Sequence, residues 1–393
     1  MKYRDLGKTG LEVSEIGIGT EYLVKAAKGD IKDVVKTAVD AGCNYFDILF
    51  DNPEYLDGFG EALKGIRDKV IITAHIFTLD PIEKCKGKFE DFLNRVKCGY
   101  VDILFISCCD REEVYNAVTD LSGKLSDEIN IRTLGQDYVL KQHGGHLKYA
   151  KELQEQGRVK YLGFSTHVLP TAIRAVKDGY IDLLMFPINP IFDALPGKAG
   201  MENLNELWEL SIEHKKIEIS EERKELHKLC MHTQTGLIAM KPFAGGWLLK
   251  PDLNANITAI KLLSYTLSQS GVTTVIPGVS NLDQLKSCLK YLEASNEEKD
   301  FSEMLSQLKW NPKDRCMYCS HCQPCKAGID IAQVNKLYDL SVEYGINEVI
   351  KNEYDSLASK AEDCLNCGEC TSRCPFGINV PDRMKKASEM IEV

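Results

Sequence analysis

Residues 30–48 read DIKDVVKTAVDAGCNYFDI, a helical stretch followed directly by a short apolar run. Apolar residues recur at helical spacing in the first part, and Asp30 and Gly42 stand where a helix would be capped and stopped. The run NYFDI at 44–48 has the composition of a buried strand. A helix that leads into such a strand is the unit from which parallel sheets are built.

The same unit repeats along residues 14–295. The strand-like runs are SEIGIGT, NYFDI, VIITAH, VDILFIS, VKYLGFS, DLLMFPI, LIAMKP and TTVIPG. Eight strand–helix units of this total length predict an α/β fold, a (β/α)8 barrel over residues 1–300, whose reacting groups lie at the C-terminal ends of the strands. A doubly wound open sheet is the alternative.

Two connections are much longer than usual and run over about 111–157 and about 193–225. Both follow the C-terminal end of a strand. Each is therefore interpreted either as a lid or partner-docking element over the barrel mouth, or as a surface insertion. The HGGH segment at 143–146 is interpreted as a solvated turn.

Composition limits the possible partners. The 393 residues carry a net charge of -10 and no Lys/Arg-rich block, which argues against nucleic acid or an anionic membrane as a partner. Neither a signal-peptide region nor a long apolar span is present in the sequence. We therefore expect a cytoplasmic protein, and the many thiols point to an anaerobe or microaerophile.

Eight of the fifteen cysteines fall in two motifs near the C-terminus, CMYCSHCQPC from 316 and CLNCGECTSRCP from 364. Triplets at two-residue spacing followed by a fourth Cys resemble the ferredoxin layout for two [4Fe–4S] clusters. The first motif departs from it, because Lys326 stands where Pro is usual. Two zinc ribbons or a disulfide knot are the alternatives, and tandem triplets fit zinc poorly.

In two-cluster ferredoxins the fourth Cys of each motif binds the other cluster. We therefore predict crossed ligation. One set is Cys316, Cys319, Cys322 and Cys374, and the other is Cys364, Cys367, Cys370 and Cys325. The stretch between the motifs, including IDIAQVNKLYDLSVEYG, has helical spacing, so residues 301–393 are predicted to form an all-helical ferredoxin-like domain with two clusters.

The segments YRDLGKTGLEVSEIGIGT, AGCNYFDI, GRVKYLGFSTH, GLIAMKPFAGG and GVTTVIPGVSNLDQL resemble the aldo/keto reductase superfamily in order and spacing. With the C-terminal cysteines, the chain is similar to its iron–sulfur branch. The resemblance implies a barrel whose usual members bind NADPH and reduce a carbonyl with an Asp, Tyr, Lys and His tetrad. Fold alone does not carry that activity.

Three of the four tetrad roles are altered here. Asp47 matches the family Asp, but Asn52 stands at the usual Tyr position, with Tyr55 nearby. His75 replaces the family Lys and Ser107 replaces the family His. Without a neighbouring cation, a phenol with a pKa near 10 is a poor acid at neutrality. We therefore favour His75 as the proton donor or relay, with its pKa raised by Asp47.

The cofactor positions are retained only in part. Ser165 and Asn189 supply polar groups for a carboxamide, and Gly278, Ser280 and Asn281 form a plausible phosphate loop, or an ordinary turn. The resemblance implies contacts that are replaced here by Met185, Met240, Ser287 and Cys288. NADP(H) is accordingly expected to bind weakly or not at all.

Other residues also carry chemistry. His75, Ser107, Cys108 and Cys109 are expected to converge near Asp47, as a soft-metal site, a reactive thiol or plain core. His167 is a candidate proton donor, and Lys241 a cation for an anionic substrate.

The function we predict is an iron–sulfur oxidoreductase that couples a ferredoxin- or flavodoxin-type partner to a small molecule in the barrel mouth. Its candidate catalytic residues are Asp47, Tyr55, His75, His167 and Lys241. The alternatives are an NADPH-dependent carbonyl reductase with a divergent tetrad, and a catalytically inert barrel that serves as an electron-transfer or scaffold subunit.

Overall fold

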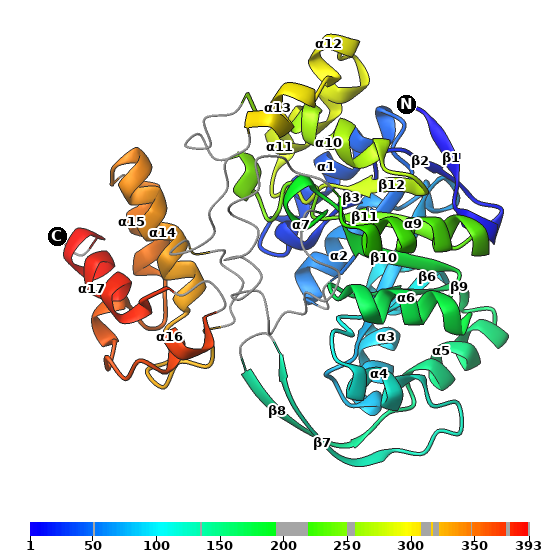
Figure 1. Cartoon of the computed structure of the whole chain (residues 1–393), viewed down its shortest axis with the longest axis horizontal. Helices are drawn as coiled ribbons and strands as arrows, with labels where there is room; N and C mark the ends of the chain where they lie inside the picture. The colour runs from blue at the N-terminus through cyan, green and yellow to red at the C-terminus, as the bar shows by residue number, and fades with distance from the viewer. Residues whose placement is uncertain are drawn as a thin grey trace. The chain divides into compact units, whose positions relative to one another are not determined.

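The computed structural model describes residues 1–49, 52–133, 136–193, 219–249, 256–307, 316, 322–346, 348–374 and 378–391. The chain divides into two compact units, one built around a barrel and one that contains the C-terminal helices. In Figure 1 the barrel unit runs from blue to yellow, and the C-terminal helices are orange to red.

All eight predicted strands form. They are β3 (Ile18–Gly19), β4 (Tyr45–Asp47), β5 (Ile71–Phe77), β6 (Val101–Ser107), β9 (Val159–Ser165), β10 (Leu183–Pro187), β11 (Gly236–Met240) and β12 (Val272–Ile276). They pair in parallel in this order, and bridges Ile16–Val275 and Gly19–Gly278 join the first edge to the last. The closed barrel is confirmed and the open sheet is excluded.

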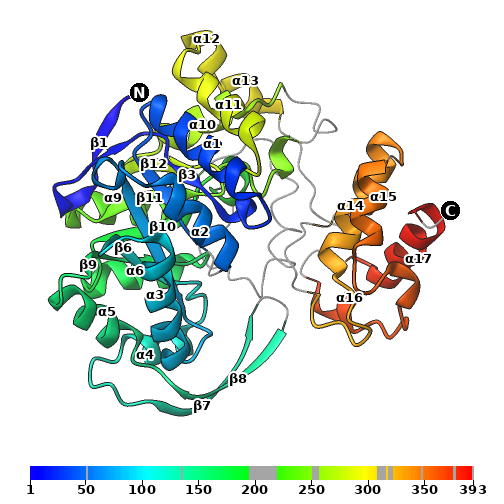
Figure 2. The same ribbon diagram turned by 180° about the vertical axis from the view of Figure 1, so that it is seen from behind.

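Helices surround the barrel in both ribbon views (Figures 1 and 2). They include α1 (Lys28–Asp40), α2 (Pro53–Ala62), α3 (Ile82–Val96), α6 (Leu169–Asp178), α9 (Glu221–Thr233), α10 (Ala259–Ser268) and α11 (Leu282–Leu289). The short helices α12 (Asn296–Lys299) and α13 (Ser302–Gln307) follow. The prediction of Asp30 as the cap of α1 is wrong, because Ala27 is the N-cap and Asp30 lies in the first turn, where a carboxylate favours the helix dipole.

An antiparallel hairpin precedes the barrel and is formed by β1 (Tyr3–Asp5) and β2 (Glu12–Ser14). Arg4 Nη1 donates to the carbonyl of Val272, 2.7 Å away at the start of β12. The hairpin is thus attached at the N-terminal ends of the strands, opposite the mouth.

The barrel interior is filled by apolar side chains. The core cluster includes Tyr45, Phe105, Met185 and Met240. Gly163 stands opposite Phe105 across β9 and β6, and a Cβ at Gly163 would lie 2.3 Å from the Phe105 ring. Glycine is therefore required at 163 to leave room for that ring.

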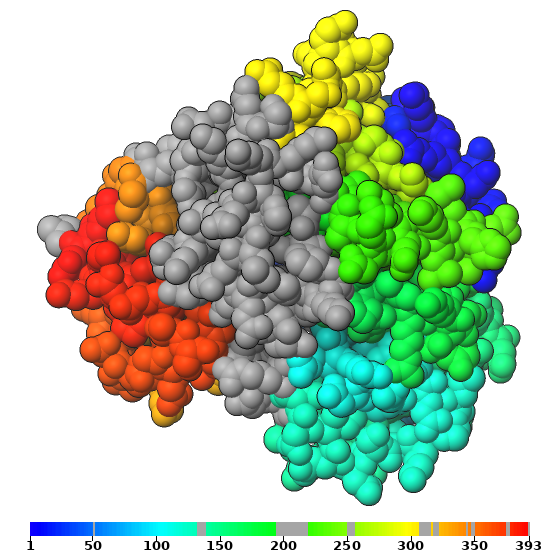
Figure 3. Space-filling model, in the orientation of Figure 1, coloured from blue at the N-terminus to red at the C-terminus, as the bar shows by residue number. Residues whose placement is uncertain are grey.

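The first long connection is an ordered insertion with its own secondary structure. It contains α4 (Glu112–Thr119), a two-stranded sheet of β7 (Ser126–Thr133) and β8 (Gln136–His143), and α5 (His146–Glu155). In the space-filling view segments coloured cyan and teal, the colours of this insertion, lie at the surface (Figure 3).

The interpretation of HGGH as a solvated turn is wrong. His143 is 1% exposed and His146 is 0% exposed. The Nε2 of His143 donates to the carbonyl of Thr78 at 2.6 Å, and that of His146 donates to the carbonyl of Asp80 at 3.0 Å. Because both acceptors lie after β5, the two imidazoles fasten the insertion to the β5–α3 loop.

The second long connection begins after the short helix α7 (Pro190–Asp193), and residues 194–218 lie outside the described part. Its two described ends meet, because Ser220 N donates to the carbonyl of Asp193 at 3.0 Å. Beneath this contact, Arg223 Nη1 lies 3.0 Å from Asp193 Oδ1, and the Tyr265 hydroxyl donates to Asp193 Oδ2 at 2.9 Å.

Helices joined by turns and irregular segments make up the part of the C-terminal unit described between 322 and 391, and no strand occurs in that part. It contains α14 (Ile331–Tyr344), α15 (Glu348–Asp355), α16 (Glu369–Arg373) and α17 (Val380–Ile391). The helices predicted between the two cysteine motifs are thus present as α14 and α15. Among the described residues, no helix combines the length and the apolar character that crossing a membrane requires.

Candidate active site and cluster cysteines

Polar side chains gather at the C-terminal ends of the barrel strands. Asp47 ends β4, Ser107 ends β6, Ser165 ends β9, and Lys241 follows β11. His75 does not end its strand as expected, because β5 continues through Phe77. Since parallel strands end on one side of the barrel, these groups share the mouth.

His75 is the centre of a buried hydrogen-bonded cluster. Its Nε2 lies 2.9 Å from Asp47 Oδ1 and its Nδ1 lies 2.7 Å from Ser107 Oγ. The Thr73 hydroxyl donates to the same Asp47 oxygen at 2.9 Å. The imidazole stacks on Phe105, with centroids 5.2 Å apart, and its side chain is 0% exposed. Both ring nitrogens are therefore occupied by protein groups.

Tyr55 is buried in α2 and packs edge-on against Phe59, with ring centroids 5.0 Å apart. Its hydroxyl binds the hydroxyl of Thr20, and Thr20 in turn donates to the backbone carbonyl of Asp47. Burial raises the pKa of Tyr55 well above its usual range. Its catalytic assignment stays a prediction, which its 0% exposure disfavours.

His167 forms a second pair, with Asp110, which the sequence analysis missed. His167 Nδ1 donates to Asp110 Oδ2 at 3.0 Å. The other oxygen, Oδ1, accepts from His167 N at 2.7 Å and from the Thr166 hydroxyl at 2.9 Å. Burial acts to raise the pKa of Asp110, but His167 and Thr166 outweigh it, and the pKa is lowered.

Burial of the adjacent cysteines Cys108 and Cys109 disfavours a reactive thiol there. Burial raises the pKa of Cys108 to about 12, with Asp110 adding to the shift, and raises that of Cys109 well above its usual value. Thiols with such pKa values stay protonated at neutral pH and are poor nucleophiles and metal ligands. Among the residues described, no three His, Cys, Asp or Glu side chains are grouped so that they could hold a metal ion, and the soft-metal alternative stays a prediction.

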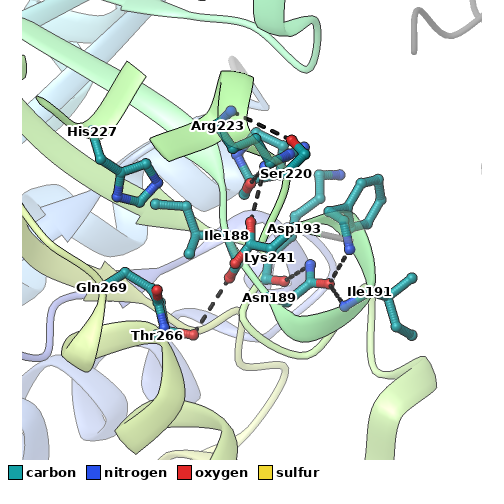
Figure 4. A network of polar contacts seen from close by, with 12 residues as sticks. Ile188, Asn189, Ile191, Asp193, Ser220, Arg223, His227, Lys241, Thr266 and Gln269 are labelled. Atoms are coloured by element: carbon teal, nitrogen blue, oxygen red, sulfur yellow. Dashed lines mark hydrogen bonds and ion pairs between the residues drawn. The ribbon is translucent and has the colours of Figure 1, made fainter. Parts of the chain in front are cut away.

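Lys241 and Asn189 are linked at the mouth, as Figure 4 shows. Asn189 is fully buried, and its Nδ2 donates to the carbonyl of Lys241 at 2.9 Å while its Oδ1 accepts from the backbone N–H groups of Ile191 and Phe192. Lys241 has a φ of 55°, which a non-glycine residue rarely adopts. The described contacts of Asn189 thus hold the backbone of Lys241, and a cofactor contact stays a prediction.

The other predicted cofactor residues are partly engaged by protein groups. Ser165 Oγ lies 3.5 Å from the N–H of Cys108. Ser280 N donates to the side chain of Gln284 at 2.9 Å, and Asn281 caps α11 through the N–H of the same Gln284. The ring of Tyr22 lies over Gly278, where a Cβ would come within 2.6 Å of it.

Four cysteines of the C-terminal unit line one cavity. They are Cys325, Cys364, Cys367 and Cys370, with Ile329, Ile331, Val380 and Met384 as apolar lining. Arg373 crosses between the motifs and donates from Nη2 to the carbonyls of Cys322 at 2.9 Å and Pro324 at 2.6 Å. Cys316, Cys322 and Cys374 are also among the described residues, and Cys319 lies outside them.

This donor set fits a cubane. A cubane binds each thiolate at a different iron, so it requires thiols around a cavity. A zinc ion would instead require its ligands at one point. The apolar side chains on one part of the lining would limit the access of water to a cluster, although Cys367 is exposed.

Comparison with known proteins gives two family matches. Residues 15–190 match the aldo/keto reductase family, and residues 312–378 match the 4Fe-4S dicluster domain. The chain is 23% identical over 351 residues to an uncharacterized oxidoreductase YqkF of Bacillus subtilis, covering 80% of this chain and 97% of that protein.

Solved structures agree on the fold. The holo form of aldo-keto reductase AKR11C1 from Bacillus halodurans has a TM-score of 0.55 at 18% identity, with 79% of this chain and 97% of that chain covered. An aldo-keto reductase from Klebsiella pneumoniae in complex with NADPH has a TM-score of 0.50 at 15% identity, with 76% and 93% covered. These likenesses establish the barrel architecture.

Proposed function

We propose that this chain, an oxidoreductase of the aldo/keto reductase family with a C-terminal 4Fe-4S dicluster domain, converts a small molecule in the barrel mouth with electrons exchanged with a protein redox partner. The observation that carries the proposal is the cavity that Cys325 shares with the three cysteines of the second motif. When bound, the clusters would supply one-electron transfer.

The crossed cysteine sets remain our assignment for the cluster ligands. Cys325 belongs to the first motif in sequence, yet it lines the cavity of the second, which supports its predicted place beside Cys364, Cys367 and Cys370. The bonds from Arg373 to the first motif also hold the two motifs together. By the same logic Cys316, Cys319 and Cys322 are joined by Cys374, and the chain binds eight irons.

The barrel supplies the site for the small molecule. Asp47, His75, His167 and Lys241 lie at or near the strand ends where barrel enzymes carry out their chemistry. An ammonium group at Lys241 would orient an anionic part of the substrate. The domain limits 1–300 and 301–393, a ferredoxin- or flavodoxin-type partner and an anaerobic cytoplasm complete the proposal.

A second candidate is an NADPH-dependent carbonyl reductase, and the family match favours it. Several contacts argue against tight NADP(H) binding: Met185 and Met240 belong to the barrel core, and Tyr22 covers Gly278. Each lost cofactor contact is worth about 1 kcal/mol, so that together they would weaken binding by roughly a hundredfold. We therefore expect at most weak binding.

Three measurements test these proposals. Anaerobic iron and sulfide analysis with EPR should give eight irons per chain, and Cys325→Ser should disturb the cluster of Cys364, Cys367 and Cys370. About four irons in the wild type, or stoichiometric zinc, would refute the dicluster assignment. Micromolar NADPH affinity in a fluorescence titration would instead favour the carbonyl reductase. Unchanged turnover in Asp47→Asn, His75→Ala and His167→Ala, each with full cluster content, would favour the inert-barrel alternative.

A further inference from the structure

The barrel mouth contains two His–Asp pairs of unequal exposure. The His75 side chain is 0% exposed and its nitrogens bind Asp47 and Ser107. The His167 side chain is 16% exposed, and among the described residues its Nε2 has no hydrogen-bond partner. A proton donor must reach its substrate, so the two imidazoles are not equivalent.

We propose that His167, positioned by Asp110, is the group that delivers protons to the substrate in the barrel mouth, and that His75 is a sealed structural element. The inference rests on the proposed function, because it names the acid for the reduction proposed there. His167 thus replaces His75 as the favoured proton donor, since the sequence alone favours His75.

Asp110 sets both the direction and the tautomer of the His167 ring. Asp110 is 6% exposed and its carboxylate only accepts hydrogen bonds, so the proton of the neutral ring is held on Nδ1. Nε2 is then directed away from Asp110 and is free to carry the transferable proton. The bonds from His167 N and Thr166 to the other oxygen fix the carboxylate itself.

The step balances for reduction of an unsaturated polar group such as a carbonyl. The carbonyl takes up two electrons and two protons. His167 in its doubly protonated form gives the Nε2 proton to the oxygen and is left as the Nδ1–H tautomer, which Asp110 stabilises. The second proton comes from water, and two successive one-electron transfers from the reduced partner protein supply the electrons.

A purely structural role for Asp110 makes a different prediction. If Asp110 only holds the loop before α6 in place, its essential contacts are the hydrogen bonds that Oδ1 accepts from His167 N and from Thr166. Asp110→Asn keeps an oxygen for both. It places an amide N–H opposite His167 Nδ1, however, so the ring proton is forced onto Nε2. Asp110→Asn therefore distinguishes a role in holding the loop from a role in positioning the His167 ring.

The first test is chemical accessibility in the intact holoprotein. Diethyl pyrocarbonate labels accessible imidazoles, and peptide mass spectrometry reads each site separately. We expect His167 to react at least tenfold faster than His75. Equal rates, or a faster His75, would overturn the proposal.

The second test reads the tautomer by ¹⁵N NMR of histidine-labelled holoprotein. The neutral His167 ring should carry its proton on Nδ1 in the wild type, on Nε2 in Asp110→Asn, and again on Nδ1 in Asp110→Glu. Asp178→Asn is the matched control. Asp178 ends α6, and its carboxylate accepts a hydrogen bond from the Tyr115 hydroxyl, so this substitution should not affect the His167 ring. An unchanged tautomer in Asp110→Asn would contradict the positioning role.

Turnover driven by dithionite-reduced methyl viologen completes the design. With full cluster content, Asp110→Asn should lose about 10²- to 10⁴-fold in rate, as expected for a general acid in the wrong tautomer. The Asp178→Asn control should stay within about twofold of the wild type. A changed tautomer with unchanged turnover would refute the proton-delivery role. Absence of turnover in the wild type would count against the proposed function, whereas the labelling and NMR results would still decide the geometry.

Discussion

Replacing Arg223 with Met should strongly destabilise the barrel, because it leaves a buried charge without its partner. Asp193 is 0% exposed, and among the described residues its carboxylate forms side-chain contacts only with Arg223 and Tyr265. Figure 4 shows Asp193 beside Arg223. Removal of one member of a buried ion pair costs about 3–5 kcal/mol, because the other charge remains desolvated. We expect a loss of that size for Arg223→Met at neutral pH.

The raised pKa of Asp193 predicts how the destabilisation by Arg223→Met depends on pH. Burial raises the pKa of Asp193 to about 6, so the folded state holds the proton more tightly than the unfolded state does. A group of this kind favours folding at low pH and opposes it as the pH rises through about 4 to 6. Without Arg223 the ionised Asp193 carboxylate opposes folding more strongly. The deficit of Arg223→Met should therefore shrink when the pH is lowered from 7 to 5.

Hydrogen exchange with mass spectrometry on the anaerobic holoprotein is the assay, read on peptides of β10 and α9. Lys224→Met is the matched control, since its ammonium is exposed on the same helix and pairs with Glu221. An exposed pair of this type contributes at most about 1 kcal/mol. The double variant Asp193→Leu with Arg223→Met should recover most of the lost stability, because an apolar pair needs no partner charge. The reasoning fails if Arg223→Met costs less than about 1 kcal/mol, or if its deficit grows on acidification.

Three further changes have defined outcomes. Gly163→Ala should cost about 1–3 kcal/mol, because its Cβ would lie 2.3 Å from the Phe105 ring; an unchanged thermal midpoint would show that the ring moves freely. Asp102→Asn should cost about 1.5–3 kcal/mol in the same measurement, since the buried carboxylate accepts from Arg67 at 2.8 Å and from Lys160 at 3.0 Å. Burial lowers the pKa of His146 to about 4, so the unfolded state binds the extra proton first, and stability should fall as the pH drops from about 6.5 toward 4. His146→Gln should flatten that pH dependence, and an equally steep decline in the variant would assign it to other groups.

Sequence reasoning located the strands and the cysteine motifs but not the pairings between distant side chains. All eight strands were predicted because alternation of short apolar runs with helical spacing is a local property of the chain. Asp110 was not predicted as a site residue because it is a single acidic residue in a loop, and its partner His167 is 57 residues away in the sequence. The only available signal was its position three residues beyond the end of β6.

Burial was the other quantity that the sequence did not reveal. Tyr55 was predicted as a catalytic candidate and HGGH as a solvated turn, and both interpretations require exposed side chains. In the structure Tyr55 is covered by Phe59, and His143 and His146 bond to carbonyls more than sixty residues earlier in the chain. The sequence thus did not determine which polar groups face the mouth, because their exposure depends on the positions of the loops.

The sequence by itself determined the barrel, the helical C-terminal unit and the two cysteine motifs, because each depends on spacing along the chain. The tertiary structure decided that Cys325 lines the cavity of the second motif, that His75 is sealed, and that His167 is oriented by Asp110. The physical reason is that hydrophobic periodicity acts within a segment. Hydrogen bonding and desolvation depend instead on which segments meet, and the parallel strand ends bring together residues from across the chain.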